Sequence, residues 1–333
     1  MSLENGCEVI VNTCMSISEN DKVVIVTDNE SKKIADCIRE KVLDITPDTR
    51  YFNLDIYGER PLNRLPDTID KKATEATVTF FVAKTIKGEL DTVRMPFFNA
   101  GVNGGRHAHM MNITEEIVEK GIDVDYERVE EFTQKVHSVA KKATDMRIKT
   151  DKGTDLSVEV GRFKWVAATG ISKQAGDWLN LPDGEVYTAP DTMEGTVVAD
   201  GTMGDYFDGM FSLDEIENAE LTLTIKTFDR PKVVDIDCKD TELKEEFTQY
   251  VNEYECSQIV GEVGLGTNIF LEELIGNILM DEKHPTAHIA FGDPNDNMTF
   301  AGWKCPKHVD LVLQDCDIWL DDEMIMEKGT YLI

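Results

Sequence analysis

Long hydrophobic runs and a surplus of basic charge are both missing from this chain of 333 residues. No segment approaches the ~18–20 consecutive apolar residues that a membrane-spanning helix needs. Asp and Glu number 64 against 34 Lys and Arg, which gives a net charge of −30. A chain with this much negative charge repels phosphate backbones and anionic lipids. Neither nucleic acid nor a membrane is therefore expected as a partner. We interpret most of the acidic excess as a solvated surface, although metal sites also require carboxylates.

Paired cysteine motifs are absent as well. The seven cysteines include no CxxC pair, and their odd number and irregular spacing fit neither a disulfide framework nor a zinc–thiolate site. We therefore expect reduced thiols. The N-terminal residues "MSLENGCEVIVNTC" do not have the pattern of a secretory signal. Together these absences predict a cytoplasmic protein.

The first part of the chain alternates between strand and helix patterns. A β-branched run at 22–28 predicts a strand, apolar residues at helical spacing predict a helix over 29–45, and 126–146 is typical of an amphipathic helix. This alternation predicts an α/β domain with a mainly parallel sheet over residues 1–146. The turn "VTDNESKK" lacks the glycines of a dinucleotide-binding fingerprint, so NAD binding is not expected.

From residue 147 to 333 the pattern changes to short strands separated by glycine and aspartate turns. Only 241–254 and 268–281 are interpreted as helices, and the acidic segment 213–225 is interpreted as a loop and the solvent face of a strand. The fold class predicted for the whole chain is therefore an N-terminal α/β domain followed by a β-rich α+β domain.

The segment "KHVDLV" near the end of the chain interrupts a predicted buried strand with two polar residues, His308 and Asp310. Residues two apart on a strand share a face, so these side chains project together, roughly 6–7 Å apart along the strand. A hydrogen-bonded pair within the sheet and a pair of metal ligands are both compatible with this spacing.

Three other segments offer partners for this pair. His288 lies in the strand-like run "PTAHIAFGD", which predicts a buried imidazole. Glu262 stands among glycines in "VGEVGLGTN", where a buried carboxylate needs a cation or a hydrogen-bonded partner. Glu185 lies in a turn bracketed by two prolines. Each alone also fits a structural role. Together, two histidines and three carboxylates form a nitrogen and oxygen ligand set suited to Zn, Co, Mn or Fe.

Four motifs, taken in order, carry a family resemblance. "NLPDGEVYTAP", "GEVGLGTN", "DEKHPTAHIAFG" and "HVD" resemble the thermophilic metalloaminopeptidase family, the aminopeptidase T-type leucyl aminopeptidases, and "TDLSVEVGRFKW" upstream fits the same family. The resemblance covers the second domain well and the first only through "RHAHM" and the general layout. It implies hydrolysis of N-terminal residues from peptides by a homodimeric enzyme.

The resemblance also implies the composition of the site. It would hold two divalent metal ions (Zn, Co or Mn), which activate a water and polarise the peptide carbonyl. Glu262 would both bind metal and relay the proton to the leaving amine. The ligands implied by the resemblance are Glu185, Glu262, His288, His308 and Asp310.

Two positions depart from the family pattern. The family has a catalytic tyrosine where this chain has Asn295, and a tryptophan where it has Val309. An Asn can still donate a hydrogen bond to an oxyanion, so Asn295 is a predicted catalytic residue together with Glu262.

Shorter proteins similar to this family supply an alternative function. Some are ring-cleaving dioxygenases that act on dihydroxypyridines with a single Fe(II), for which the 2-His-1-carboxylate triad would be His288, His308 and Asp310. A metal-binding protein without activity is a third possibility. Outside this set, His107 and His109 in "GRHAHM" are interpreted as structural hydrogen-bonding residues, with substrate binding as the alternative.

Overall fold

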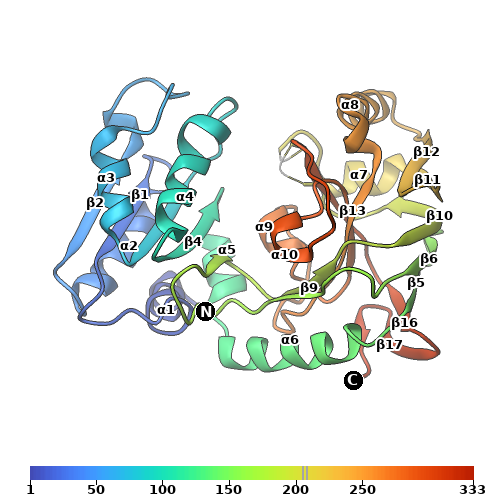
Figure 1. Ribbon diagram of the computed structural model, residues 1–333, viewed down its shortest axis with the longest axis horizontal. Coiled ribbons are helices and arrows are strands. Elements are labelled where there is room, and N and C mark those ends of the chain that lie inside the picture. The colour runs from blue at the N-terminus through green and yellow to red at the C-terminus, as the bar shows by residue number, and fades with distance from the viewer. Residues whose placement is uncertain (205, 208) are drawn as a thin grey trace. The chain divides into compact units, whose positions relative to one another are not determined.

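The computed structural model describes residues 1–204, 206–207 and 209–333, which form two compact units (Figure 1). One unit comprises Met1–Glu130 and Thr169–Asp183, and the other comprises Glu131–Ala168 and Gly184–Ile333. The single division predicted after Met146 differs from this one, because residues 169–183 return to the first unit after strands of the second have formed.

The first unit is built on a five-stranded sheet in the order β2-β1-β3-β4-β8, with every neighbouring pair parallel. Strands β1 and β3 are buried along their whole length, as expected of parallel strands covered on both faces. The strands are β1 Val23–Thr27, β2 Thr49–Asn53, β3 Val78–Ala83, β4 Arg106–Met111 and β8 Trp178–Asn180.

Helices α2 to α5 of the first unit alternate with its strands in the chain, and α1 precedes β1. Helix α2 buries Ile34, Cys37, Ile38 and Val42, the residues whose helical spacing predicted it. The helices are α1 Leu3–Val9, α2 Lys32–Leu43, α3 Asp67–Glu75, α4 Met95–Val102 and α5 Glu115–Ile117, with short π or 3-10 turns at Ile10–Cys14, Leu54–Ile56, Leu90–Arg94 and Val118–Ile122. Helix α6, Tyr126–Ala140, begins in the first unit and continues into the second.

Strand β4 of the first unit carries the two histidines of "GRHAHM". Hydrogen bonds link Thr79 Oγ1 to His107 Nδ1 (2.8 Å) and His107 Nε2 to His109 Nδ1 (3.1 Å), and both imidazoles are buried. Both imidazoles thus make the hydrogen bonds expected of a structural role, while substrate binding by this pair stays a prediction.

The second unit contains two antiparallel sheets. An eight-stranded sheet runs in the order β12-β11-β10-β6-β5-β16-β17-β18, and a five-stranded sheet in the order β15-β14-β13-β9-β7. Apolar residues of both sheets belong to one core. The strands are β5 Asp145–Lys149, β6 Asp155–Glu159, β7 Val166–Ala168, β9 Glu185–Thr188, β10 Thr192–Ala199, β11 Leu221–Thr227, β12 Pro231–Asp237, β13 Val260–Gly266, β14 Ala287–Gly292, β15 His308–Val312, β16 Asp317–Leu320, β17 Glu323–Glu327 and β18 Thr330–Tyr331.

Helices of the second unit depart in two places from the sequence prediction. Helix α7, Leu213–Ala219, occupies part of the acidic segment interpreted as a loop, and Ser212 and Glu215 form a capping box at its start. The helix predicted over 268–281 is reduced to α9, Ile278–Asp281. The predicted helix at 241–254 is confirmed as α8, Thr241–Asn252. The remaining short helices are η5 Glu255–Gln258 and α10 Asp296–Thr299.

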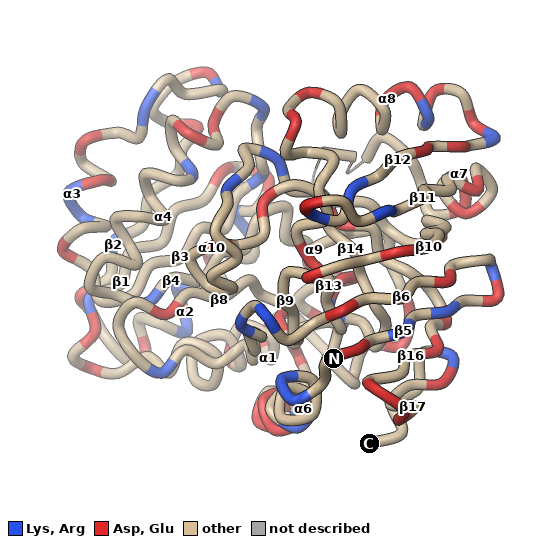
Figure 2. The backbone as a smooth tube through the Cα atoms, turned by 45° about the vertical axis from the view of Figure 1, so that its right-hand side comes forward, with Lys and Arg blue, Asp and Glu red and all other residues tan. Residues whose placement is uncertain are grey.

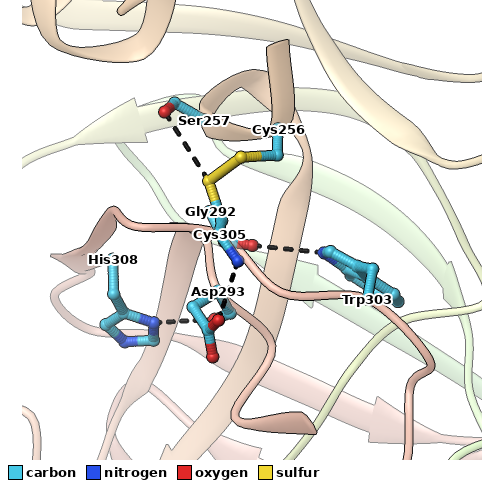
Figure 3. The surroundings of a disulfide bond; sticks show 7 residues. All are labelled: Cys256, Ser257, Gly292, Asp293, Trp303, Cys305 and His308. Carbon is cyan, nitrogen blue, oxygen red and sulfur yellow. Dashed lines mark hydrogen bonds between the residues drawn. A yellow bond between two sulfur atoms is a disulfide. The ribbon is translucent and has the colours of Figure 1, made fainter. Parts of the chain in front are cut away.

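A disulfide joins Cys256 and Cys305, whose Cα atoms are 5.7 Å apart (Figure 3). The prediction that all seven cysteines are reduced is therefore wrong for this pair. The two residues are separated by 49 positions in the sequence. Spacing alone could not pair them, because only the folding of β13 and β14 brings η5 near the segment before β15.

Acidic residues occur along the backbone of both units (Figure 2). Among the helices that the structure describes, none combines the length and apolar character needed to cross a membrane.

Candidate metal centre

Neighbouring strands of the five-stranded antiparallel sheet in the second unit carry all five predicted ligands. In this sheet β13 lies between β9 and β14, and β14 pairs in turn with β15. His288 on β14 stands opposite Gly264 on β13, and Asp310 on β15 stands opposite Ala290 on β14. Glu185 is the first residue of β9 rather than part of the preceding turn. Antiparallel pairing thus brings together residues that lie far apart in the sequence.

Ligand atoms of these residues form two clusters that share one carboxylate. In each cluster the atoms lie within 4.8 Å of one another. We call them the β9 cluster, made of Glu185, Glu262 and His288, and the β15 cluster, made of Glu262, His308 and Asp310.

The β9 cluster is held by contacts to the imidazole of His288. Nε2 of this residue lies 3.3 Å from Glu262 Oε1 and 3.4 Å from Glu185 Oε2. A Cβ atom at position 264 would lie 2.0 Å from the same Nε2. Gly264 is thus required for the imidazole to pack against the β13 backbone.

The β15 cluster contains the pair identified in "KHVDLV". His308 Nε2 lies 3.3 Å from Asp310 Oδ2, and His308 Nδ1 lies 2.8 Å from the carbonyl oxygen of Asp293. A carbonyl can only accept, so Nδ1 carries a proton and donates it. In the neutral imidazole this leaves the lone pair on Nε2, the atom that faces the other ligands.

The surroundings shift the pKa values of His288, His308 and Asp310 in different directions. Burial opposes protonation of His288, but its hydrogen bond to Glu262 and the nearby carboxylates raise its pKa to about 9. Burial likewise opposes the charge on His308, yet Asp310 raises the pKa of this imidazole well above its ordinary value. Burial would raise the pKa of Asp310, but the charge of His308 outweighs it and the pKa falls to about 2. Metal binding by these imidazoles would therefore release protons.

One buried ligand atom supports a metal at this place. Among the residues that the structure describes, Asp310 Oδ1 has no hydrogen-bond partner. Leaving a buried polar atom unsatisfied costs about 1–3 kcal/mol, and metal coordination to a cluster of this composition is one way to avoid that cost. The nitrogen and oxygen donors, with no thiolate among them, fit a divalent ion.

Asn295, the predicted catalytic residue, lies beside the shared carboxylate. It adopts a left-handed backbone conformation (φ 54°) at the start of α10, and its Nδ2 donates a 2.9 Å hydrogen bond to Glu262 Oε2. The side chain thus orients Glu262, and its Nδ2 carries a second proton that it can donate to another acceptor.

Sequence reasoning missed two charged residues at the centre, Glu282 and Lys283. The Lys283 side chain is 1% exposed, and its Nζ lies 2.6 Å from Glu185 Oε1 and 2.7 Å from Glu282 Oε1. Burial raises the pKa of Glu282 to about 8, although the charge of Lys283 opposes this. Both residues stand in the quoted motif "DEKHPTAHIAFG", but they follow α9 in a turn, where no strand or helix period indicates which way they project.

The fold and this buried cluster of histidines and carboxylates are typical of a metal-dependent enzyme. The family model of the thermophilic metalloproteases (M29) matches residues 123–303, so the chain belongs to that family. The family resemblance predicted from the motifs is confirmed.

One curated relative carries an activity in its name. The chain is 25% identical over 208 residues to a 2,5-dihydroxypyridine 5,6-dioxygenase from Pseudomonas putida, a match that covers 58% of this chain and 55% of that protein. The match thus spans only about half the length of this curated relative.

Two solved structures share the fold over nearly the full length. Wild-type AmpT from Thermus thermophilus superposes with a TM-score of 0.71 at 16% identity, covering 99% of each chain. The 2,5-dihydroxypyridine dioxygenase of Pseudomonas putida superposes with a TM-score of 0.70 at 16% identity, covering 100% of this chain and 98% of that one. The predicted fold class, a parallel α/β unit followed by antiparallel β-rich sheets, is confirmed.

Proposed function

We propose that this protein is a metal-dependent aminopeptidase that removes N-terminal residues from peptides. The observation that carries the proposal is the position of Glu262, whose carboxylate belongs to both ligand clusters. A carboxylate placed in this way can hold metal and also accept the proton of a water molecule beside it.

The residues that would hold metal are those of the two clusters. A divalent ion bound there would lower the pKa of a water molecule and polarise a peptide carbonyl. The chain itself supplies orientation, because Asn295 fixes Glu262 Oε2 by a 2.9 Å hydrogen bond and Asp293 fixes the ring of His308. The second amide proton of Asn295 would stabilise an oxyanion. The cluster's carboxylates would attract the protonated amine of a peptide.

A single-Fe(II) ring-cleaving dioxygenase is the second candidate. Asn295 in place of the tyrosine of the aminopeptidases favours it, as does the 25% identity to a dihydroxypyridine dioxygenase. His288, His308 and Asp310 would form the triad.

A comparison of two substrates tests these functions. Protein purified anaerobically is loaded with Zn²⁺, Co²⁺, Mn²⁺ or Fe²⁺ and assayed on leucine p-nitroanilide and on 2,5-dihydroxypyridine. The proposal expects hydrolysis of the anilide, abolished in Glu262→Gln and unchanged in Glu323→Gln, a matched change at an exposed position. Ring cleavage with Fe²⁺ and no hydrolysis would contradict it and establish the alternative.

The partners and setting of this activity stay predictions. We expect a peptide or another small-molecule substrate, a homodimer and a cytoplasmic location, and neither nucleic acid nor a membrane surface as partner. Light scattering of the purified protein measures the oligomeric state.

A further inference from the structure

A positive charge of the protein itself, the ammonium of Lys283, lies beside the β9 cluster. Lys283 Nζ lies 2.6 Å from Glu185 Oε1, and its side chain is buried beside Glu282. Glu185 therefore already has a cationic partner at contact distance. A buried ion pair of this kind is disrupted only at considerable cost, because removing either partner leaves an uncompensated charge.

The backbone around Lys283 fixes where its ammonium can be. Its amide donates to Met280 O (3.0 Å), and its carbonyl accepts from Asn268 N (2.9 Å). Lys283 is not a flexible surface lysine, since it is completely buried in a turn that these two backbone hydrogen bonds hold in place. The buried ammonium thus lies beside the β9 cluster, against Glu185 and Glu282.

The β15 cluster differs in its charge partners. Among the residues that the structure describes, Asp310 pairs with His308 and no lysine or arginine forms an ion pair with this carboxylate. Asp310 Oδ1 is the atom left without a hydrogen-bond partner there. A divalent ion at the β15 cluster would meet this open donor, whereas an ion bound to Glu185 would compete with the ammonium that lies 2.6 Å from that carboxylate and would be repelled by it most strongly.

We propose that Lys283 takes the place of a second metal ion, so that the centre binds one divalent cation, through Glu262, His308 and Asp310. This inference rests on the proposed metal-dependent function and departs from the two ions implied by the family resemblance. Lys283 supplies the positive charge that neutralises Glu185, and Glu262 is the carboxylate that the β9 cluster shares with the metal-binding β15 cluster.

The number of bound ions in the wild-type protein tests the inference directly. Metal-free protein is titrated with Zn²⁺ by calorimetry and with Co²⁺ by equilibrium dialysis, and elemental analysis counts the ions after removal of the excess. One ion per chain is expected. Two ions per chain with similar affinities, or no binding, would overturn the inference without any substitution being needed.

Variants separate the two clusters. Glu185→Gln should change the affinity for the single ion less than about tenfold, whereas Asp310→Asn should weaken it by roughly 100-fold or more. Lys283→Met should admit a second ion, visible as a stoichiometry of two and as altered Co²⁺ absorption, while Lys283→Arg should keep one. Lys239→Met, at an exposed lysine, is the matched control. Equal losses in Glu185→Gln and Asp310→Asn would contradict the assignment.

These counts do not depend on which reaction the protein catalyses. One ion without peptide hydrolysis would contradict the proposed aminopeptidase and leave the role of Lys283 standing. Two ions per chain together with peptide hydrolysis would support the proposed aminopeptidase and contradict the role of Lys283.

Discussion

Gly264 determines whether His288 can occupy its place in the centre. A Cβ atom at this position would lie 2.0 Å from His288 Nε2. Gly264→Ala should therefore displace the imidazole and disturb Glu262, which His288 Nε2 contacts at 3.3 Å, so that Zn²⁺ affinity falls by less than about tenfold and the fold is destabilised by about 1–3 kcal/mol. Calorimetry and urea denaturation measure the two effects.

A control for this substitution is Gly302→Ala, where a Cβ would meet nothing within 4 Å. It should leave Zn²⁺ affinity unchanged, although its positive φ of 84° still costs some stability. Unchanged Zn²⁺ affinity in Gly264→Ala would remove His288 from the residues that shape the metal centre.

At the residue scale the sequence revealed the groups that lie on strands. His308 and Asp310 were recognised because alternation along a strand places them on one face, and their side chains do meet. Lys283 was not recognised, because it follows a short helix in a turn and reaches Glu185 only through the tertiary fold. No periodicity could have indicated that contact.

Strand β4 should make the stability of the protein depend on pH through His107. Burial lowers the pKa of this imidazole to about 3, against an ordinary value of 6.5. Above 6.5 both states are neutral. Below it the unfolded chain binds a proton that the folded chain refuses, so stability is lost as the pH falls from 6.5 toward 3.

His107→Gln removes this contribution. The free energy of unfolding, measured by urea denaturation between pH 6 and pH 4, should fall less steeply with decreasing pH in the variant, by about 1 kcal/mol per pH unit. Parallel curves for the variant and the wild type would mean that His107 does not stay neutral in the folded state. A uniform offset between the curves reflects lost packing and is not the effect sought.

The segment before β15 should be covalently tied to η5. Cys305 N donates to Asp293 Oδ2 (2.8 Å), and the Asp293 carbonyl accepts from His308, so the disulfide lies close to a predicted metal ligand (Figure 3). Thiol titration of denatured, unreduced protein should count the five free cysteines, and seven after reduction. Seven before reduction would show that the bond is absent.

At the element scale the sequence prediction failed where two signals competed. The acidic segment at 213–219 suggested a solvated loop, but Ser212 and Glu215 have the spacing of a capping box and begin a helix. At 268–277 a helix was predicted from apolar residues at helical spacing, but none forms. The backbone there makes tertiary hydrogen bonds instead, for example from Asn268 N to Lys283 O.

For the whole molecule, the net charge of −30 predicts that salt stabilises the fold. Mutual repulsion of the carboxylates favours the expanded chain, and added ions screen that repulsion. Raising NaCl from about 0.05 M to about 0.5 M at pH 7.5 should raise Tm by a few degrees. Near the isoelectric pH of 4.5 the same addition should have little effect. Equal shifts at both pH values would assign the stabilisation to a cause other than charge screening.

The return of residues 169–183 to the first unit limits how this protein can be divided. Strand β8 completes the parallel sheet beside β4, yet β5, β6 and β7 of the other unit precede it in the chain. A gene cut at one point therefore cannot yield both units intact. Neither unit can have been acquired, lost or exchanged by joining a single continuous stretch of DNA at its end. Recombination that respects the fold must instead use several junctions, or transfer the chain as a whole.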